Sequence, residues 1–194
     1  MTDTLAGTAA FTLEVKHSRF LAQAAPVDSP GAALAFMARV SDPGATHNCW
    51  AWRLDDQYRS SDDGEPAGTA GRPILAAIDG QGYDRVAVVV TRWYGGIKLG
   101  AGGLVRAYGG AAAECLRRAE RLPLVAMRFL ELQAGFDDIG AVHAALASFG
   151  AEKLDEQFNA DGLRLRLSLP ADRADALQAQ LRDATRDRVK FASS

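Results

Sequence analysis

The sequence predicts an α+β protein built from two domains, and three observations carry that prediction. The stretch Arg85–Thr91 is rich in β-branched residues and almost wholly apolar, which is typical of a strand buried on both faces. After Pro123 the pattern changes, and the expected elements follow the order βαββαβ of the split ferredoxin-like arrangement. A length of 194 residues suits two small domains. We therefore expect domains at residues 1–122 and 123–194.

The first part of the N-terminal domain is expected to contain three strands and one helix. Alternation of apolar and polar residues predicts two of the strands, and an aromatic-rich run predicts the third. Ser29 followed by Pro30 is typical of a helix start, and three apolar side chains are expected on one side of that helix: Leu34, Met37 and Val40. In order, these elements are strands at 11–15 and 20–24, a helix between residues 29 and 41, and a strand at 48–54.

A polar, glycine-bearing segment from Asp55 to Gly71 separates these elements from a second group. The second group comprises a short helix, the buried strand, a glycine-rich loop and a longer helix. Arg117 and Arg118 lie in the last turn of the longer helix, where cations interact favourably with the helix dipole. The helices are expected at 72–78 and at about 104–119, and the strand at 85–91.

The C-terminal domain is expected to follow the βαββαβ order through short elements. Asp161 and Gly162 separate two alternating runs and predict a hairpin turn between them. The expected elements are a strand within 124–136, a helix at 139–149, strands at 153–159 and 163–169, a helix at 172–186 and a closing strand at 189–191.

The overall charge is nearly neutral. With 22 Lys and Arg residues against 24 Asp and Glu residues, the net charge is −2, which excludes a basic chain that coats nucleic acid along its whole length. The two cysteines, Cys49 and Cys115, are far apart and show no zinc-ligand spacing. No apolar run approaches the ~20 residues that cross a bilayer, and the start shows no signal-peptide pattern. We expect a cytoplasmic protein without membrane contact.

Within the N-terminal domain the charges are sorted by segment. Residues 85–106 include four basic residues and no acidic one, whereas residues 55–65 include five acidic residues and one arginine. This local sorting leaves room for one specific anion site despite the neutral average. The basic residues are Arg85, Arg92, Lys98 and Arg106, and the acidic ones are Asp55, Asp56, Asp62, Asp63 and Glu65.

Residues 91–110 carry the strongest local signal for function, centred on a glycine loop at residues 95–103. Seven glycines lie where a buried strand passes into a helix, so backbone N–H groups can approach an anion and the helix start adds positive potential. Trp93 or Tyr94 is a candidate to stack on a base. The pattern is neither a P-loop nor a dinucleotide loop, and the alternative is that the glycines only permit tight turns and close packing. The candidate nucleic-acid or anion-binding residues are Arg92, Tyr94, Gly95, Gly96, Lys98, Gly100, Gly102, Gly103 and Arg106, joined by His47 and Thr69.

An acidic loop at residues 60–71 has three carboxylates within four residues: Asp62, Asp63 and Glu65. These are candidates to hold a divalent metal or to act as acid and base. The simpler interpretation is a turn whose side chains bind backbone N–H groups. A third option joins the two segments, with the acidic loop paired to Arg92 or Arg106 so that it holds the glycine loop in shape.

His47 immediately precedes the strand at 48–54. His47 and Cys49 lie two residues apart, so their side chains share one face of a strand and a catalytic dyad is geometrically possible. No nucleophile signature accompanies them, which favours a structural or ligand-contact role for His47. We therefore assign no catalytic residue and no cofactor, and we leave a metal open.

Together, three segments resemble the YigZ/IMPACT family. They read ATHNCWA at 45–51, SDDGEPAGTAGRP at 61–73 and TRWYGGIKLGAGGLVRAY at 91–108. The likeness is specific over about residues 18–119, and the layout after Pro123 is similar to that of the bacterial members. The resemblance implies that the N-terminal domain is a β/α sandwich like the second domain of ribosomal protein S5 and domain IV of elongation factor G. It also implies a ferredoxin-like C-terminal domain similar to domain V of that factor.

The resemblance and the sorted charges lead to one interpretation and two alternatives. The interpretation is a non-enzymatic RNA- or ribosome-associated protein that acts in the regulation of translation, with Arg92, Lys98 and Arg106 contacting phosphate. One alternative is a metal-dependent hydrolase or transferase that acts on a phosphorylated small molecule through the carboxylates of the acidic loop and His47. The other is a module that binds a protein partner through the sheet of the C-terminal domain.

Overall fold

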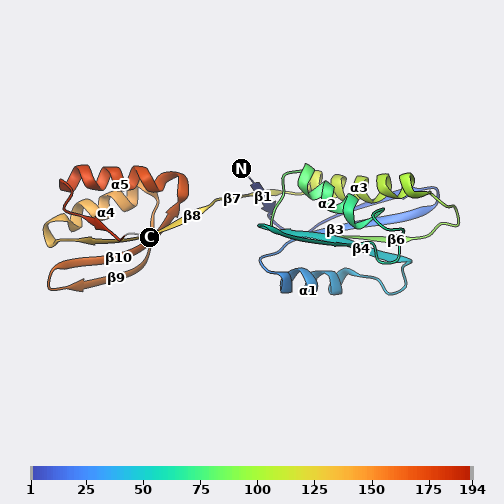
Figure 1. Ribbon diagram of the computed structural model, residues 1–194, viewed down its shortest axis with the longest axis horizontal. Coiled ribbons are helices and arrows are strands. Elements are labelled where there is room, and N and C mark those ends of the chain that lie inside the picture. The colour runs from blue at the N-terminus through green and yellow to red at the C-terminus, as the bar shows by residue number, and fades with distance from the viewer. Residues whose placement is uncertain (1, 193–194) are drawn as a thin grey trace. The chain divides into compact units, whose positions relative to one another are not determined.

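The computed structural model describes residues 2–192 and divides into two compact units, the first ending at Leu124 and the second beginning at Val125 (Figure 1). Helices and strands mix in both units, which confirms the predicted α+β class. Each unit buries its own clusters of hydrophobic side chains. Among residues 2–192, no helix is long and apolar enough to cross a membrane.

Unit 1 is built on a five-stranded antiparallel sheet with helices on both faces (Figure 1). Its elements are β2 (Ala9–Val15), β3 (Ser18–Pro26), α1 (Pro30–Val40), β4 (His47–Leu54), β5 (Gln57–Ser61), α2 (Gly71–Gly80), β6 (Val86–Trp93) and α3 (Ala101–Arg118). The strands lie in the order β2-β3-β6-β4-β5, which makes β6 the central strand. Helix α1 covers one face, and α2 and α3 pack side by side on the other.

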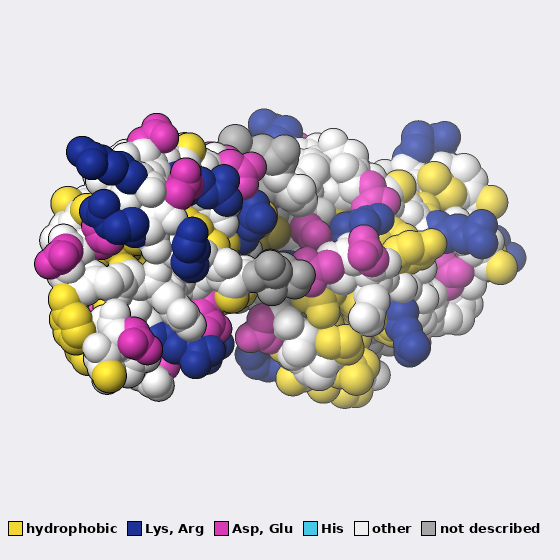
Figure 2. All heavy atoms as spheres, turned by 60° about the vertical axis from the view of Figure 1, so that its left-hand side comes forward, with side chains coloured by type: hydrophobic (Ala, Val, Ile, Leu, Met, Phe, Trp, Pro, Cys, Tyr) yellow, Lys and Arg dark blue, Asp and Glu magenta, His cyan; other side chains and the backbone are white. Residues whose placement is uncertain are grey.

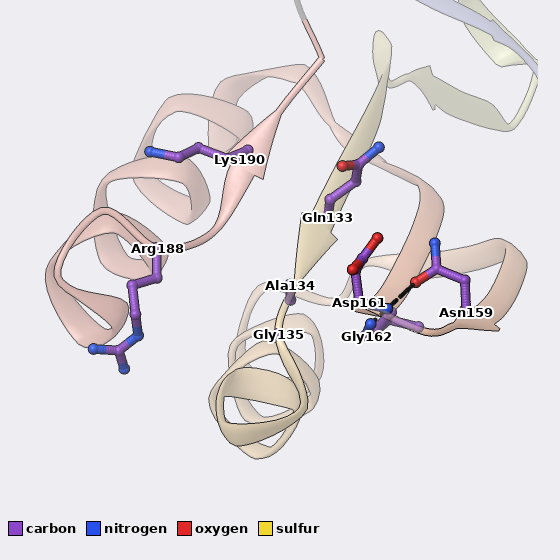
Figure 3. A pocket seen from close by; sticks show the side chains of 9 residues that line it. Gln133, Ala134, Gly135, Asn159, Asp161, Gly162, Arg188 and Lys190 are labelled. Atoms are coloured by element: carbon purple, nitrogen blue, oxygen red, sulfur yellow. Dashed lines mark hydrogen bonds between the residues drawn. The ribbon is translucent and has the colours of Figure 1, made fainter.

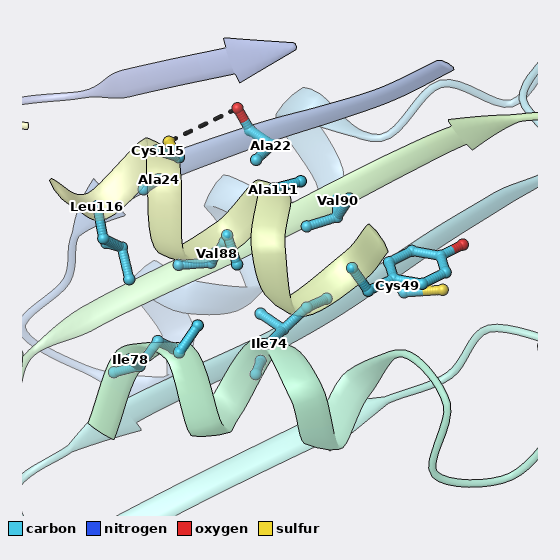
Figure 4. Close-up of a cluster of buried hydrophobic side chains, with 14 of the residues drawn as sticks. Ala22, Ala24, Cys49, Ile74, Ile78, Val88, Val90, Ala111, Cys115 and Leu116 are labelled. Atoms are coloured by element: carbon cyan, nitrogen blue, oxygen red, sulfur yellow. Dashed lines mark hydrogen bonds between the residues drawn. The ribbon is translucent and has the colours of Figure 1, made fainter. Parts of the chain in front are cut away.

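Strand β6 shows why this sheet needs both faces covered. Its alternate residues Val86, Val88 and Val90 pack beneath α2 and α3. The residues between them, Ala87 and Val89, pack on the side of α1. All five side chains are fully buried, as the apolar run predicts for a strand enclosed on both faces. Figure 4 shows the core between this strand and the two helices.

Helix α1 begins where the sequence predicts, but its buried side differs. The Ser29 hydroxyl accepts a hydrogen bond from the Ala32 backbone N–H at 3.2 Å and so caps the helix. Phe36 and Met37 are buried, whereas Leu34 is 60% exposed. Leu34 is exposed because the Phe36 side of the helix lies against the sheet.

The polar segment after β4 contains a strand that the sequence pattern did not predict. Strand β5 pairs with β4 in a hairpin that runs from Leu54 opposite Gln57 to Trp50 opposite Ser61. It forms one edge of the sheet, and its side chains are exposed or half-buried, so no apolar alternation marks it in the sequence. The hairpin places the start of the acidic loop beside β4.

A two-stranded ribbon joins the two ends of unit 1. Strand β1 (Thr2–Leu5) pairs antiparallel with β7 (Arg121–Leu124), and Thr2 lies opposite Leu124. Residue 122, at which the sequence pattern placed the domain boundary, lies inside β7. The strand contains Pro123, which cannot donate a backbone hydrogen bond but can occupy a ribbon of only two strands.

Unit 2 follows the predicted order βαββαβ, with helices on one face of a four-stranded antiparallel sheet (Figure 1). Its elements are β8 (Met127–Ala134), a 3-10 turn (Phe136–Asp138), α4 (Ile139–Phe149), β9 (Glu152–Asn159), β10 (Gly162–Pro170), α5 (Ala171–Thr185) and β11 (Lys190–Phe191). The strands lie in the order β11-β8-β10-β9. Inward side chains of β8 and β10 form the core with α4 and α5, so the opposite face of the sheet has no helix over it.

On the face that Figure 2 presents, basic and acidic side chains are interspersed with hydrophobic ones. This mixture agrees with the net charge of −2. An anionic ligand must therefore be held by a local group of residues rather than by a broad field.

Candidate functional site

The segments that the sequence singles out meet at one end of the sheet in unit 1. His47, at the start of β4, lies opposite Arg92, near the end of β6. The acidic loop follows β5, and its Glu65 side chain contacts Arg92. The glycine loop continues from β6 into α3. The sheet register thus brings together residues that are up to 45 positions apart in the sequence, from 47 to 92.

A buried polar cluster joins the acidic loop to β6 and α3. The Glu65 Oε1 atom accepts hydrogen bonds from Arg92 Nη1 at 2.6 Å and from the Tyr108 hydroxyl at 2.7 Å. Arg92 Nη2 also donates to the Ser18 hydroxyl at 3.4 Å. The Arg92 and Glu65 side chains are only 6% and 4% exposed. Of the options open from the sequence, the structure contains the pairing of the acidic loop with Arg92.

Burial affects the ionisation of the side chains in this cluster. It raises the pKa of the Tyr108 phenol, and Cys49 and Glu65 nearby raise it further, so Tyr108 acts as a hydrogen-bond donor. Arg92 Nε has no hydrogen-bond partner among residues 2–192. The Arg92 guanidinium also lies 5.4 Å from the centre of the Tyr94 ring. Because Arg92 neutralises a carboxylate inside the fold, its position argues against the phosphate contact expected from the sequence.

His47 lies at the edge of this cluster. Its Nδ1 atom is 2.6 Å from the Asp63 carbonyl oxygen, so Nδ1 carries the proton and donates it. Its Nε2 atom is 3.8 Å from Glu65 Oε2. Cys49 does not form a dyad with His47, because its Sγ donates to the Asp62 carbonyl oxygen at 3.0 Å. Burial raises the pKa of the Cys49 thiol to about 12, so the thiol stays protonated at neutral pH.

The other two carboxylates of the acidic loop bind backbone N–H groups. Asp62 accepts hydrogen bonds of 2.8 to 3.0 Å from three of them, those of Gly68, Ala70 and Gly71. Burial opposes the ionisation of Asp62, but these three bonds outweigh it and lower its pKa. Asp62 therefore caps the start of α2. Asp63 Oδ2 accepts a hydrogen bond from the Asn48 N–H at 2.6 Å and fixes the loop to β4.

The acidic loop is therefore organised by internal bonds. The buried Thr69 hydroxyl donates to the Pro66 carbonyl oxygen at 2.6 Å. Glu65, Asp62 and Asp63 each have a different set of partners. In the described part of the chain, no group of three or more His, Cys, Asp or Glu side chains is placed to hold a metal ion.

The glycine loop packs against the turn between β2 and β3. A Cβ atom at Gly95 would lie 2.0 Å from the carbonyl carbon of His17, so only glycine fits at this position. The Gly95 N–H donates to the Ser18 hydroxyl at 3.1 Å. The Tyr94 N–H donates to the Thr46 hydroxyl at 2.9 Å. These contacts hold the first residues of the loop in place.

The remaining glycines shape the start of α3. Gly96 and Gly100 have φ angles of 86° and 73°, which glycine adopts more easily than other residues. A Cβ at Gly102 would lie 3.5 Å from Arg106 Nη1, so the Arg106 side chain folds back over the first turn of α3. Gly103 is half-buried in the same turn. The glycines thus bring the backbone and the Arg106 guanidinium close together.

Two basic side chains of this region remain at the surface. Lys98 and Arg106 are exposed, and neither forms an ion pair with another residue in 2–192. Tyr94 and Ile97 are 46% and 43% exposed. Helix α3 begins after Gly100 without a capping side chain and without an acidic residue in its first turn. We call Tyr94, Ile97, Lys98 and Arg106 the loop surface.

Sequence reasoning missed three residues that organise the site: Ser18, Asn48 and Tyr108. Tyr108 carried a signal, because a tyrosine in an apolar helix stripe needs a partner for its hydroxyl. The contacts of Ser18 and Asn48 depend on the register of β3, β4 and β6, which a single sequence does not specify.

The sequence of this chain is similar to two family models and to several known proteins. Its sequence matches the family model of the Impact N-terminal domain over residues 16–116 and that of a domain of unknown function (DUF1949) over residues 132–188. An IMPACT family member from Thermus thermophilus is 49% identical over 177 residues, which cover 90% of this chain and 97% of that protein. This chain belongs to the IMPACT family. The family member YigZ of Escherichia coli is 39% identical over 185 residues, which cover 92% of this chain and 90% of YigZ.

The likeness to bacterial members extends through both units, whereas the likeness to vertebrate members is partial. The protein IMPACT of Xenopus laevis is 37% identical over 99 residues, which are 46% of this chain and 31% of the frog protein. A solved crystal structure of a hypothetical protein superposes with a TM-score of 0.70 at 35% identity and covers 100% of this chain and 98% of its own.

Proposed function

We propose that the protein binds RNA, alone or in the ribosome, through the loop surface of unit 1, and that it acts in the cytoplasm in the regulation of translation. The observation that carries the proposal is that Lys98, in the glycine loop, and Arg106, in α3, are exposed and form no ion pair within residues 2–192, and that the Tyr94 side chain of the same segment is 46% exposed. Cations without carboxylate partners are available to phosphate. An exposed aromatic ring can stack on an unpaired base.

Two further considerations support this proposal. The glycines of the loop leave backbone N–H groups close to the surface, where a phosphate can reach them. The family resemblance implies likeness to ribosomal protein S5 and to domains IV and V of elongation factor G. We include the likeness of the two units to these ribosomal and elongation-factor domains in the proposal as a prediction.

We do not extend the proposal to a metal-dependent hydrolase or transferase. Glu65 is occupied by Arg92 and Tyr108, and Asp62 is occupied by backbone N–H groups. His47 donates to a backbone carbonyl oxygen. The contacts of these residues give no support to a catalytic role over a structural one.

Filter binding to ribosomal RNA fragments over a salt series tests the proposal. The Lys98→Ala/Arg106→Ala variant removes two phosphate contacts, so we expect the slope of log affinity against log salt to fall by about 2. A matched control is Arg117→Ala/Arg118→Ala, because these cations lie at the other end of α3 and both bond to Glu114. Equal effects of the two double variants, or no binding by the unmodified protein at low salt, would refute the proposal.

A further inference from the structure

The turn between β2 and β3 lies against the start of the glycine loop. Lys16 and His17 are the two residues of this turn. The Ser18 hydroxyl, which follows them, accepts hydrogen bonds from the Gly95 N–H at 3.1 Å and from Arg92 Nη2 at 3.4 Å. Because Ser18 is fully buried, these bonds hold the turn in a fixed position beside the glycine loop.

Both residues of the turn have a backbone conformation that suits other side chains better. Lys16 and His17 have φ angles of 48° and 63°. A two-residue hairpin with two positive φ angles is a type I′ turn, for which Asn followed by Gly is strongly preferred. Histidine adopts this region more often than lysine does, so Lys16 bears most of the steric cost. Lys16 is therefore not the residue that gives this turn its greatest stability.

The hairpin between β9 and β10 in unit 2 shows the more usual choice of residues (Figure 3). The Asn159 side-chain oxygen accepts hydrogen bonds from the N–H groups of Asp161 and Gly162 at 2.9 and 3.0 Å. Gly162 takes a positive φ angle, of 136°. This hairpin uses the residue types that favour a turn, and neither residue of the β2–β3 turn is among them.

Inside the fold, the Lys16 side chain has no polar contact that would offset this cost. Lys16 and His17 are exposed, and neither side chain forms a hydrogen bond or an ion pair with another residue in 2–192. Arg85 is different, because it too has a positive φ angle, of 52°, but its guanidinium bonds to Asp55. An unfavourable backbone conformation that no internal contact explains points to a role at the surface.

The charge of Lys16 adds to that of the loop surface. Glu14, the nearest acidic residue along the chain, lies opposite Arg19 in the β2–β3 ladder, so the charges of these two residues offset each other. Lys98 is three residues from Gly95, which is at most about 11 Å of extended chain. The turn thus places a further exposed cation, from a separate segment of the chain, near the loop surface.

We propose that Lys16 contacts a phosphate of the same RNA that the loop surface binds, so that the site extends from the glycine loop to the β2–β3 turn. An exposed ammonium group without a carboxylate partner is available to phosphate. The hydrogen bonds of Ser18 hold the turn in place before the RNA binds, which lowers the ordering cost of binding. The inference rests on the function proposed above, since it takes the same ligand, and it gives a reason for a lysine where asparagine would suit the turn better.

One substitution tests both parts of this inference, because they predict changes of opposite sign. Lys16→Asn suits the first position of a type I′ turn, so we expect the melting temperature of unit 1, followed by tryptophan fluorescence, to rise by about 3 °C. The same variant loses one phosphate contact. In filter binding to ribosomal RNA fragments, we therefore expect the slope of log affinity against log salt to fall by about 1. Lys16→Arg keeps the charge and should leave both measurements unchanged.

A matched control is Arg59→Gln on β5. Arg59 is an exposed cation that forms no ion pair with another residue in 2–192. Strand β5 forms the edge of the sheet opposite to β2. This variant should therefore bind RNA as the unmodified protein does.

The outcomes separate this inference from the proposed function. If Lys16→Asn has the same salt slope as Arg59→Gln, the turn makes no contact with RNA and the inference is wrong, even where Lys98→Ala/Arg106→Ala weakens binding and the proposed function stands. A melting temperature of Lys16→Asn that does not rise also overturns it, because the turn then bears no cost for a ligand contact to explain. If the unmodified protein does not bind at low salt, the proposed function falls and the inference falls with it.

Discussion

Two arginine–glutamate pairs, one in each unit, have the same contact distance and different surroundings. In unit 1, Arg92 Nη1 is 2.6 Å from Glu65, and the two side chains are 6% and 4% exposed. In unit 2, Arg164 Nε is 2.6 Å from Glu131, and the side chains are 53% and 29% exposed. The first pair is sealed by Tyr108, whereas the second lies on an open face. Burial thus decides how much the loss of one partner of such a pair costs the fold.

The comparison changes how the basic residues near the glycine loop are read. Arg92 belongs to the motif that carries the family resemblance, yet its charge is neutralised in the interior. Lys98 and Arg106, farther along the same motif, are the cations left at the surface. A motif can therefore combine residues that hold a loop in shape with residues that the loop presents.

Removing one member of the buried pair is expected to give the largest effect. Arg92→Ala leaves the Glu65 carboxylate buried without its cation, so we expect the free energy of unfolding to fall by about 3–5 kcal/mol. Arg164→Ala, the matched change in unit 2, should cost less than about 1 kcal/mol. All three tryptophans lie in unit 1, so urea unfolding followed by fluorescence reports that unit, and circular dichroism reports both. Similar losses in the two variants would break the comparison.

A second contrast concerns one glycine in each unit. In Gly95→Ala the new Cβ would overlap the His17 backbone, so the turn between β2 and β3 must move, and we expect a loss of about 3 kcal/mol. In Gly140→Ala nothing lies within 4 Å of the new Cβ, and the residue is in helix α4, so we expect a gain of about 0.5–1 kcal/mol. Thermal unfolding of the two variants measures both signs. A neutral Gly95→Ala would show that the glycine loop is not held by this close approach.

Among the unit 1 variants, the smallest expected loss of stability is that of Asp62→Asn, and this loss depends on pH. The pKa of Asp62 is lower in the folded chain than in the unfolded chain. Its stabilisation is therefore complete above its unfolded value of about 3.9 and is lost as the pH falls through the lower folded value. Asp62→Asn should lower stability at neutral pH by about 1–2 kcal/mol and reduce the loss of stability on acidification. The measurement is fluorescence-monitored unfolding between neutral pH and pH 2. If Asp62 does not stabilise the fold in this way, the free energy of unfolding should change with pH in the same manner in the variant and in the unmodified chain.

Local patterns predicted the elements whose burial is complete or regular. The valine run of β6 indicated a strand enclosed on both faces, and Ser29 with Pro30 indicated the start of α1. Strand β5 escaped prediction because an exposed edge strand has no apolar period. Strands β1 and β7 escaped because each is short and pairs with a partner more than a hundred residues away.

The sequence indicated the segments that meet in the candidate site, but not all of their residues and not the partners of those residues. The sequence showed that Glu65 and Arg92 belong to neighbouring motifs, and pairing between the acidic loop and Arg92 was one of several options. Which carboxylate faces Arg92, and that Tyr108 closes the cluster, depends on the β4–β6 register and on the packing of α3. The helix-free face of the sheet in unit 2 could not be predicted from local patterns either, because it depends on the strand order of that unit.

The β1–β7 ribbon also has a consequence for rearrangements of the chain that involve unit 1. Because Thr2 lies opposite Leu124, the two ends of the unit are neighbours in one ladder, roughly 5 Å apart. A domain with adjacent ends can be spliced into a loop of another chain, or have its ends joined and reopened elsewhere, without a spanning linker. The ribbon therefore makes unit 1 suitable for insertion into another chain and for circular permutation.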